Sequence, residues 1–307
     1  MEALSLARLR SEGKPAVARA LSLLERRPGA PETLALLDDS WRQAGGQVVG
    51  LTGPPGVGKS TLAGRLVALW RQQGRSVAVV AVDPSSRRSG GALLGDRIRL
   101  MTGTEDAGLF VRSMAARDRL GGLAALTWTA VVLLRAVFDV VLVETVGVGQ
   151  SETDVAEAVD TVVFCVQPGG GDALQFMKAG IAEIPDVAVV TKADLGPLAE
   201  RARRDLSTAL SLDVRVDGWV VPVLAVSAQD RIGLGELDAA IVRHAAWLGD
   251  GGRREARRRL QALRWIEQVV REGFGRQGLE RLPPLSLPDD ASPFSLLAET
   301  IPRLAAG

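Results

Sequence analysis

The sequence predicts an α/β fold, a doubly wound and mostly parallel sheet with helical extensions at both ends. Short β-branched runs alternate with longer stretches of helical periodicity through the middle of the chain, and this alternation is typical of a sheet covered by helices. Most of the runs are continuously apolar, as expected of parallel strands that are buried on both faces.

Six apolar runs are the expected strands, and helical stretches lie between them. The strands are expected at residues 48–52, 77–82, 140–145, 161–166, 187–191 and 220–226. The helices are expected at residues 59–73, 121–136, 172–181, 198–210 and 234–248. This order of strands and helices predicts the doubly wound sheet.

Breaks in composition divide the chain into three expected domains. Residues 1–45 form an N-terminal helical extension of two helices, separated by a Pro-Gly-Ala-Pro break, and residues 46–249 hold the sheet. Residues 250–307 form a C-terminal helical arm with a proline-rich end. The expected apolar stripe of its helix consists of Leu260, Leu263, Ile266, Val270 and Phe274. Five arginines between residues 253 and 259 are interpreted as a solvated helix face, with phosphate or dimer contacts as the alternatives.

The charge balance and the rare residue types exclude several classes of protein. Lys and Arg number 37 against 36 Asp and Glu, whereas a general nucleic-acid or membrane-surface binder carries a basic excess. Cys165 and His244 are the sole cysteine and histidine, which excludes a zinc site built from these types, and both are expected to be core residues. With no targeting or membrane segment expected, we expect a cytoplasmic protein.

A glycine-rich motif follows the first expected strand and precedes a helical stretch. It matches G-x-x-x-x-G-K-[ST] and comprises Gly53, Pro54, Pro55, Gly56, Val57, Gly58, Lys59, Ser60 and Thr61. The glycines let backbone N–H groups turn toward phosphate oxygens, and the following helix offers its unpaired N–H groups and positive dipole end. Lys59 would reach the β- and γ-phosphates, and the Ser60 hydroxyl would bind Mg²⁺. The motif predicts a nucleoside-triphosphate site.

Two polar segments at expected strand ends predict that the base is guanine. The Asp194 carboxylate can accept hydrogen bonds from both N1–H and the exocyclic amine of guanine, a donor pair that adenine lacks. Lys192 can lie over the ring, and Ser227 and Ala228 sit where a backbone N–H could meet the guanine carbonyl. The segments resemble the Asn-Lys-x-Asp and Ser-Ala-x motifs of GTPases, with Thr191 in place of Asn. Ordinary polar loops are the alternative.

Acidic residues predict a magnesium site beside the phosphates. Glu144 lies at the end of one expected strand, and Gly147 follows it. At this position nucleotide-binding sheets place an acid that faces the Mg²⁺ and a glycine that faces the γ-phosphate. Asp83 ends another strand, and Asp96 lies thirteen residues further on. The expected magnesium ligands are Ser60, Asp83, Asp96 and Glu144. The alternatives are a turn-former for Asp83 and a solvated loop acid for Asp96.

Longer strings around these residues resemble one family of GTPases. They are Asp-Pro-Ser-Ser at 83–86, Ser-Gly-Gly-Ala-Leu-Leu-Gly-Asp at 89–96, Leu-Gly-Gly at 120–122, Glu-Thr-Val-Gly-Val-Gly-Gln-Ser-Glu at 144–152, and the segment 169–175. These strings are similar to motifs of the MeaB/ArgK/MMAA family, and the similarity covers roughly residues 47–237. The string at 144–152 is highly diagnostic.

The resemblance implies a homodimeric P-loop GTPase that binds GTP, GDP and Mg²⁺. It implies a chaperone of a cobalamin-dependent acyl-CoA mutase, such as methylmalonyl-CoA mutase, which gates adenosylcobalamin delivery and protects or reactivates the mutase. It further implies that residues 169–178 form a switch toward the mutase and that the C-terminal helices form the dimer arm. By resemblance, the phosphate, magnesium and switch residues are Lys59, Ser60, Asp83, Asp96 and Glu144.

Hydrolysis is expected to be slow without a partner. The expected catalytic residues are Lys59, Asp96, Glu144 and Gln150. Gly147 precedes Val148 and not the glutamine that orients water in Ras-like proteins, while Gln150 is displaced and could be a plain helix-start residue. We therefore expect a partner to accelerate turnover by ordering the switches. Candidate activating arginines, which could equally be solvated loop residues, are Arg87, Arg88 and Arg97.

Three other functions remain open. A nickel-insertion GTPase shares the fold class, but a single Cys and a single His argue against its metal site. A kinase, for a small molecule or linked to amino-acid transport, would use Asp83 or Asp96 as a base near the γ-phosphate. A nucleotide-dependent binding module would turn over GTP negligibly.

Overall fold

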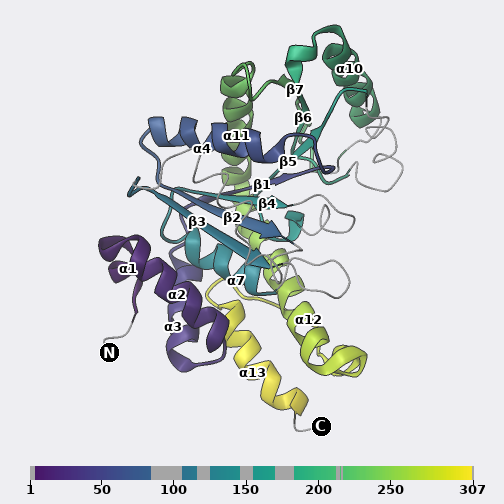
Figure 1. Cartoon of the computed structure of the whole chain (residues 1–307). Helices are drawn as coiled ribbons and strands as arrows, with labels where there is room; N and C mark the ends of the chain where they lie inside the picture. Colours follow the sequence, from purple (N-terminus) through teal and green to yellow (C-terminus); the bar gives the residue numbers. More distant parts are fainter. Residues whose placement is uncertain are drawn as a thin grey trace.

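A parallel sheet runs through the middle of the molecule (Figure 1). The computed structural model describes residues 4–83, 106–115, 125–145, 155–169, 183–211, 215 and 217–305. Its strands are β1 (Gln47–Thr52), β2 (Val77–Asp83), β3 (Leu109–Ala115), β4 (Val140–Thr145), β5 (Thr161–Val166), β6 (Val187–Thr191) and β7 (Val223–Val226). Its α-helices are α1 (Leu6–Glu12), α2 (Lys14–Arg26), α3 (Pro31–Arg42), α4 (Lys59–Gln72), α7 (Ala125–Leu134), α10 (Pro197–Ser211), α11 (Leu234–Gly249), α12 (Arg253–Arg281) and α13 (Pro293–Ala305).

The strands form one sheet in the order β3-β2-β4-β1-β5-β6-β7, and every neighbouring pair is parallel. Helices α4 and α11 cover one face, while α7 and the terminal helices cover the other (Figure 1). The structure therefore confirms the doubly wound α/β fold. Strand β1 lies where the strand order reverses, and ligands of such sheets bind beside the carboxyl ends of the strands at that point.

Alternate residues of β4 face two different hydrophobic cores, and a third core lies between β5, β6 and α10. Val141 and Val143 of β4 face the core shared with α7 and the terminal helices, whereas Val140 and Leu142 face the core shared with α4 and α11. Every residue of β4, β5 and β6 is buried. Burial on both faces explains why these strands are continuously apolar and why the sequence predicts them well.

Helices from both ends of the chain, α3, α12 and α13, pack together beside α7 (Figure 1). Trp128 of α7 stacks on Trp265 of α12 with ring centroids 4.7 Å apart, and Phe294 of α13 lies edge-on to Trp265 at 5.1 Å. Trp41 of α3 lies 6.1 Å from Trp128. Each such pair adds about 0.5–1.5 kcal/mol beyond the burial of its area, so this aromatic group joins both ends of the chain to the sheet.

Several elements differ from the sequence-based expectations. Strand β3 is not expected, because Arg112 and Ser113 interrupt its apolar pattern, which an edge strand paired only with β2 tolerates. The N-terminal segment has three helices, since Gly13, with φ of 67°, separates α1 from α2. Helix α13 forms in the proline-rich end, where Pro293 occupies a first position that needs no N–H. The strand expected at 220–226 begins only at Val223, and the helix expected at 172–181 lies outside the described residues.

The buried stripe of α12 also differs from the expected one. Ala262, Trp265 and Ile266 are buried on it, whereas Leu260 is 49% exposed. Arg258 is buried on the same stripe, so the interpretation of the arginine cluster as a solvated face is wrong for this residue. Polar residues on an apolar helix face give no periodicity signal, and this explains the error.

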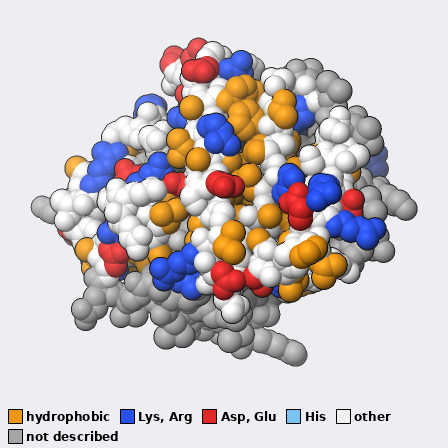
Figure 2. Space-filling view, turned by 90° about the horizontal axis from the view of Figure 1, so that it is seen from above, with side chains coloured by type: hydrophobic (Ala, Val, Ile, Leu, Met, Phe, Trp, Pro, Cys, Tyr) orange, Lys and Arg blue, Asp and Glu red, His pale blue; other side chains and the backbone are white. Residues whose placement is uncertain are grey.

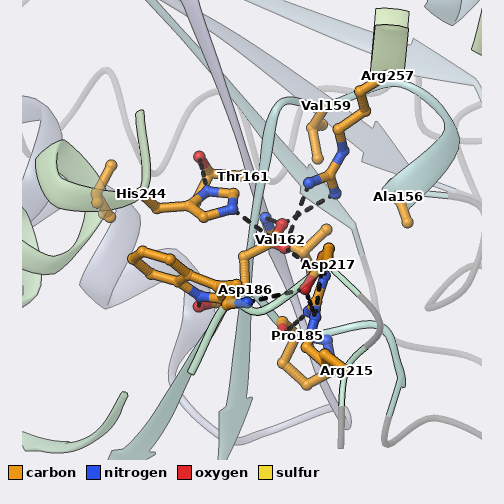
Figure 3. Close-up of polar contacts among 12 residues, drawn as sticks. Ala156, Val159, Thr161, Val162, Pro185, Asp186, Arg215, Asp217, His244 and Arg257 are labelled. Atoms are coloured by element: carbon orange, nitrogen blue, oxygen red, sulfur yellow. Dashed lines mark hydrogen bonds and ion pairs between the residues drawn. The ribbon is translucent and has the colours of Figure 1, made fainter. Parts of the chain in front are cut away.

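Aspartates mark the edge of the sheet where the strands begin. Asp139, Asp160 and Asp186 precede β4, β5 and β6, and each accepts a backbone N–H of the neighbouring chain segment at 2.7–2.9 Å. Arg258 donates to both oxygens of Asp160, at 2.8 and 2.7 Å. Arg257 likewise donates to both oxygens of Asp186, at 3.3 and 2.9 Å (Figure 3). Helix α12 is thus fixed to this edge by two adjacent arginines.

His244 of α11 lies beside Asp186 (Figure 3). Its Nδ1 shares a hydrogen bond of 2.9 Å with the Thr161 hydroxyl, and its Nε2 lies 3.3 Å from an Asp186 oxygen. Burial lowers the pKa of His244 to about 4, so the imidazole is neutral at pH 7. Burial raises the pKa of Cys165, inside β5, to about 12, so its thiol is unreactive. Both residues are core residues, as predicted.

The surface seen from above Figure 1 carries charges of both signs. Figure 2 shows Lys and Arg side chains interspersed with Asp and Glu side chains around a band of hydrophobic ones. This mixture agrees with the formal net charge of +1. Within the described ranges, no helix combines the length and the apolar character needed to cross a membrane.

Candidate nucleotide-binding site

The glycine-rich motif forms the turn from β1 into α4, at the edge where the parallel strands end. Gly53 has φ of 134°, and a Cβ there would collide with the backbone carbonyl oxygen of Cys165. Gly58, with φ of 98°, caps α4 directly before Lys59. The first N–H groups of α4 therefore follow the turn immediately, which is the arrangement that binds phosphate at a helix N-terminus.

The Lys59 side chain folds back into the glycine-rich turn that precedes it. Its Nζ donates to the carbonyl oxygens of Gly53 at 2.7 Å and Pro54 at 2.8 Å. The side chain is buried, with only 6% of the residue exposed. Lys59 therefore lies at the phosphate turn, as the sequence predicts. A bound phosphate would compete with these two carbonyl oxygens for the ammonium donors.

Ser60 and Glu144 meet at the centre of the site. The Ser60 hydroxyl donates to Glu144 Oε1 at 2.7 Å. Glu144 is buried near the end of β4, in register with Leu51 of the neighbouring β1. A hydroxyl and a carboxylate in contact are hard oxygen donors of the kind that Mg²⁺ prefers, so this pair fits the expected ion. Two residues 84 positions apart in the sequence are thereby brought together.

The remaining switch residues are only partly described. Asp83 ends β2, which pairs with β4, so its backbone lies at the same edge of the sheet as Glu144. Asp96, Gly147 and Gln150, predicted from the sequence for the magnesium and switch network, lie outside the described residues. Arg87, Arg88 and Arg97 lie outside them as well. The roles of all these residues stay predictions.

Thr191, which stands in place of asparagine in the first base motif, contacts the glycine-rich turn. Its Oγ1 lies 2.7 Å from the carbonyl oxygen of Val57 in the glycine-rich turn and 3.0 Å from that of Val166 in β5. The hydroxyl thus connects the end of β6 to the phosphate turn. Lys192, which follows with a left-handed φ of 56°, donates from Nζ to Gln167 Oε1 at 2.6 Å.

Asp194 lies in the short 3₁₀ helix η3 (Ala193–Leu195) and is exposed. Its neighbour Lys192 is exposed too, and both follow β6 at the edge that also holds the glycine-rich turn. Their exposure leaves them accessible to a base. The structure therefore places the first base motif and the phosphate turn on one side of the sheet.

The second base motif is a closed turn between β7 and α11. Ser227 and Ile232 exchange two backbone hydrogen bonds of 3.0 Å, and the Ser227 hydroxyl accepts the Asp230 N–H at 3.2 Å. Arg65 of α4 reaches this turn and donates from Nε to the carbonyl oxygen of Ala228 at 2.8 Å. Arg65 and Gln167 are absent from the sequence-based site, because a single arginine in a helix and a single glutamine after a strand form no motif.

Fold and site together define a P-loop nucleotide-binding protein. A family model described as "Methylmalonyl Co-A mutase-associated GTPase MeaB" matches residues 17–279, which is most of the chain. The chain belongs to this family of GTPases, as the sequence resemblance predicted.

Individual relatives agree with this assignment. A putative GTPase of Caulobacter vibrioides is 42% identical over 271 residues, covering 86% of this chain and 83% of the relative. GTPase ArgK of Escherichia coli is 36% identical over 289 residues, covering 90% and 87%. A crystal structure titled "LAO/AO transport system kinase" is similar with a TM-score of 0.69 and 30% identity, covering 90% of this chain and 87% of that one.

Proposed function

We propose that this chain is a Mg²⁺-dependent GTPase that gates the loading of adenosylcobalamin into an acyl-CoA mutase of the methylmalonyl-CoA mutase type and supports its reactivation. The observation that carries the nucleotide chemistry is the contact of Ser60 with Glu144 beside the buried Lys59. The mutase as client is supported by the name of the family to which the chain belongs, a GTPase associated with methylmalonyl-CoA mutase.

In the proposed mechanism the phosphates lie against the glycine-rich turn and the N-terminus of α4. Lys59 exchanges these carbonyl contacts for phosphate oxygens, and the neutral acceptors are thereby replaced by charged ones. Ser60 and Glu144, with Asp83 and Asp96, would hold Mg²⁺, which neutralises the phosphate charge that develops on cleavage. Gly147 would face the γ-phosphate, and Gln150 would help to orient water.

Base recognition is proposed at the two turns beyond β6 and β7. Asp194 accepts from N1–H and the exocyclic amine of guanine, and Lys192 covers the ring. The Ser227 turn presents a backbone N–H of Ala228 to the guanine carbonyl. Adenine would leave both the carboxylate and this N–H without partners, and unpaired polar groups of this kind give strong discrimination.

Slow intrinsic turnover and activation by the mutase are part of the proposal. The mutase would order the switches, among them the segment 169–178, and Arg87, Arg88 or Arg97 could then supply the charge that an activating arginine provides. We also propose a cytoplasmic homodimer, with a helical segment 1–45, a GTPase domain 46–249 and a dimerisation arm 250–307.

The test is GTP turnover of the purified protein with Mg²⁺, alone and with a cobalamin-dependent acyl-CoA mutase of the same organism. We expect acceleration of at least about tenfold, which Lys59→Ala abolishes. Arg71→Met, which removes a cation from the same helix far from the phosphate turn, should leave the acceleration intact. Unchanged turnover with several such mutases would contradict the gating role.

A kinase is the second candidate, favoured by the name of the similar crystal structure, a transport system kinase. Incubation with γ-labelled GTP separates the two. Label recovered as inorganic phosphate supports the GTPase, whereas label transferred to an amino acid or to a transport protein supports the kinase.

A further inference from the structure

Arg65 links the helix after the phosphate turn to the turn that would read the base. It lies six residues after Lys59 on α4, and its Nε donates to the Ala228 carbonyl oxygen at 2.8 Å. The side chain is half-buried, so solvent does not fully screen this charge-assisted hydrogen bond. A phosphate-binding helix and a base-binding turn are thereby in direct contact.

The Ser227 turn is closed by its own hydrogen bonds, which determine its shape but not its position relative to α4. At its exit, Gly233 has φ of 72°, and a Cβ there would collide with the Ala225 carbonyl oxygen. The far end of α4 is held to α11 by Trp70 Nε1, which donates to Asp238 Oδ1 at 2.8 Å. Arg65 adds a direct side-chain hydrogen bond between α4 and this turn.

We propose that Arg65 is a positioning residue for recognition of the guanine carbonyl. The carbonyl of Ala228 and the N–H of Gln229 belong to one rigid peptide plane, and the N–H of Ala228 lies on the adjoining plane. By fixing the direction of this carbonyl, Arg65 fixes where the Gln229 N–H points, and because the two planes meet at the Ala228 Cα it restricts where the Ala228 N–H can point. This inference rests on the proposed guanine site.

The choice of arginine suits this role. Its guanidinium is planar and always charged, so an Nε–H donor holds a carbonyl in one direction. A lysine at this position would keep the charge, but its rotating ammonium would fix the carbonyl less well. Loss of the contact should therefore weaken recognition of the guanine carbonyl oxygen by the turn and should leave phosphate binding almost unchanged.

The experiment compares the affinities of four diphosphates for the wild type and Arg65→Met. GDP and inosine diphosphate both carry the 6-carbonyl, whereas ADP and 2-aminopurine riboside diphosphate lack it. We expect Arg65→Met to lower the affinities for GDP and inosine diphosphate by about tenfold, and those for ADP and 2-aminopurine riboside diphosphate by less than about twofold. Arg65→Lys should weaken the carbonyl-bearing pair by about threefold.

Arg71→Met is the matched control, because it removes a guanidinium from the same helix that pairs with Asp106 and touches neither base turn. Its four affinities should equal those of the wild type. Equal weakening of all four ligands by Arg65→Met, or no weakening, would overturn the proposal; if Arg65→Met does not fold, Arg65→Lys decides by the same pattern. Wild-type protein that binds ADP as well as GDP would instead contradict the proposed function.

Discussion

The two edges of the sheet both carry carboxylates, but in different surroundings. At the edge where strands end, Glu144 contacts the Ser60 hydroxyl, and the cation Lys59 is held by backbone carbonyls. At the edge where strands begin, Asp160 and Asp186 each receive two donors from an arginine of α12 and one from the backbone. The carboxylates where the strands begin are paired with arginines and fix the position of α12, whereas the hydroxyl and carbonyl contacts of Glu144 and Lys59 can be exchanged for a ligand.

The arginine pairing also explains why α12 lies where it does. Buried ion pairs add little net stability compared with apolar residues, but removing one partner leaves a buried charge unpaired. The edge where the strands begin, here called the beginning edge, therefore fixes one arrangement of α12 against β5 and β6. Perturbing this edge should change stability and not nucleotide binding, and perturbing the other edge should do the reverse.

The largest expected effect is at the beginning edge. Arg258→Met should lower the free energy of unfolding by about 3–5 kcal/mol, because it leaves the buried Asp160 carboxylate without its arginine partner. Chemical denaturation followed by circular dichroism measures this. Arg259→Met is the control, since its pair with the exposed Asp289 should contribute less than about 1 kcal/mol. The distinction between the edges would be wrong if both variants lost the same free energy of unfolding, or if folded Arg258→Met protein lost its affinity for GDP.

At the opposite edge, Glu144→Gln should raise the Mg²⁺ concentration needed for half-maximal GTP turnover by about 10- to 100-fold. The amide oxygen can still accept from Ser60, so the free energy of unfolding without nucleotide should change by less than about 1 kcal/mol. Magnesium titrations of turnover measure the first quantity. Glu157→Gln, at a half-exposed glutamate, is the control, and an unchanged magnesium requirement would remove Glu144 from the site.

The beginning edge should also respond to acid. Burial lowers the pKa of His244 to about 4, although Asp186 acts in the opposite direction, while Arg257 and Arg215 reinforce the lowering. Because the unfolded chain takes up the proton near pH 6.5, the stabilisation is complete above that pH and is lost as the pH falls toward 4.

Between pH 7 and pH 5 we therefore expect the free energy of unfolding to fall by about 2 kcal/mol. His244→Gln can keep the contact with the Thr161 hydroxyl but cannot take up the proton, so its stability should be nearly constant over this range. Denaturation midpoints at several pH values measure the slope. The same slope in the variant would assign the acid sensitivity to other groups.

The smallest expected effect is at Thr191. Thr191→Val removes the hydroxyl between the Val57 and Val166 carbonyl oxygens and should weaken GDP by about fivefold. Calorimetry of GDP binding measures the loss. Thr191→Ser keeps the hydroxyl and should bind GDP as the wild type does, so a similar loss in both would mean that the methyl group, and not the hydrogen bond, matters.

The parts of the fold and site that could be predicted are those with a local signature. The apolar runs of β4, β5 and β6 predicted strands because both faces are buried, and the glycine-rich motif predicted its turn because few other residues tolerate the φ values at Gly53 and Gly58. Strand β3 and helix α13 lack such signatures: one is an edge strand with an interrupted pattern, and the other begins in a proline-rich segment.

The sequence by itself determined the fold class, the phosphate turn and the family, because each depends on residues that are close together in the chain. Only the tertiary structure decided that Arg258 pairs with Asp160, that Ser60 meets Glu144 and that Arg65 holds the Ala228 turn. Those partners are 98, 84 and 163 residues apart. Hydrogen bonds and ion pairs over such separations leave no periodic pattern, so they become visible only when the strands and helices are assembled.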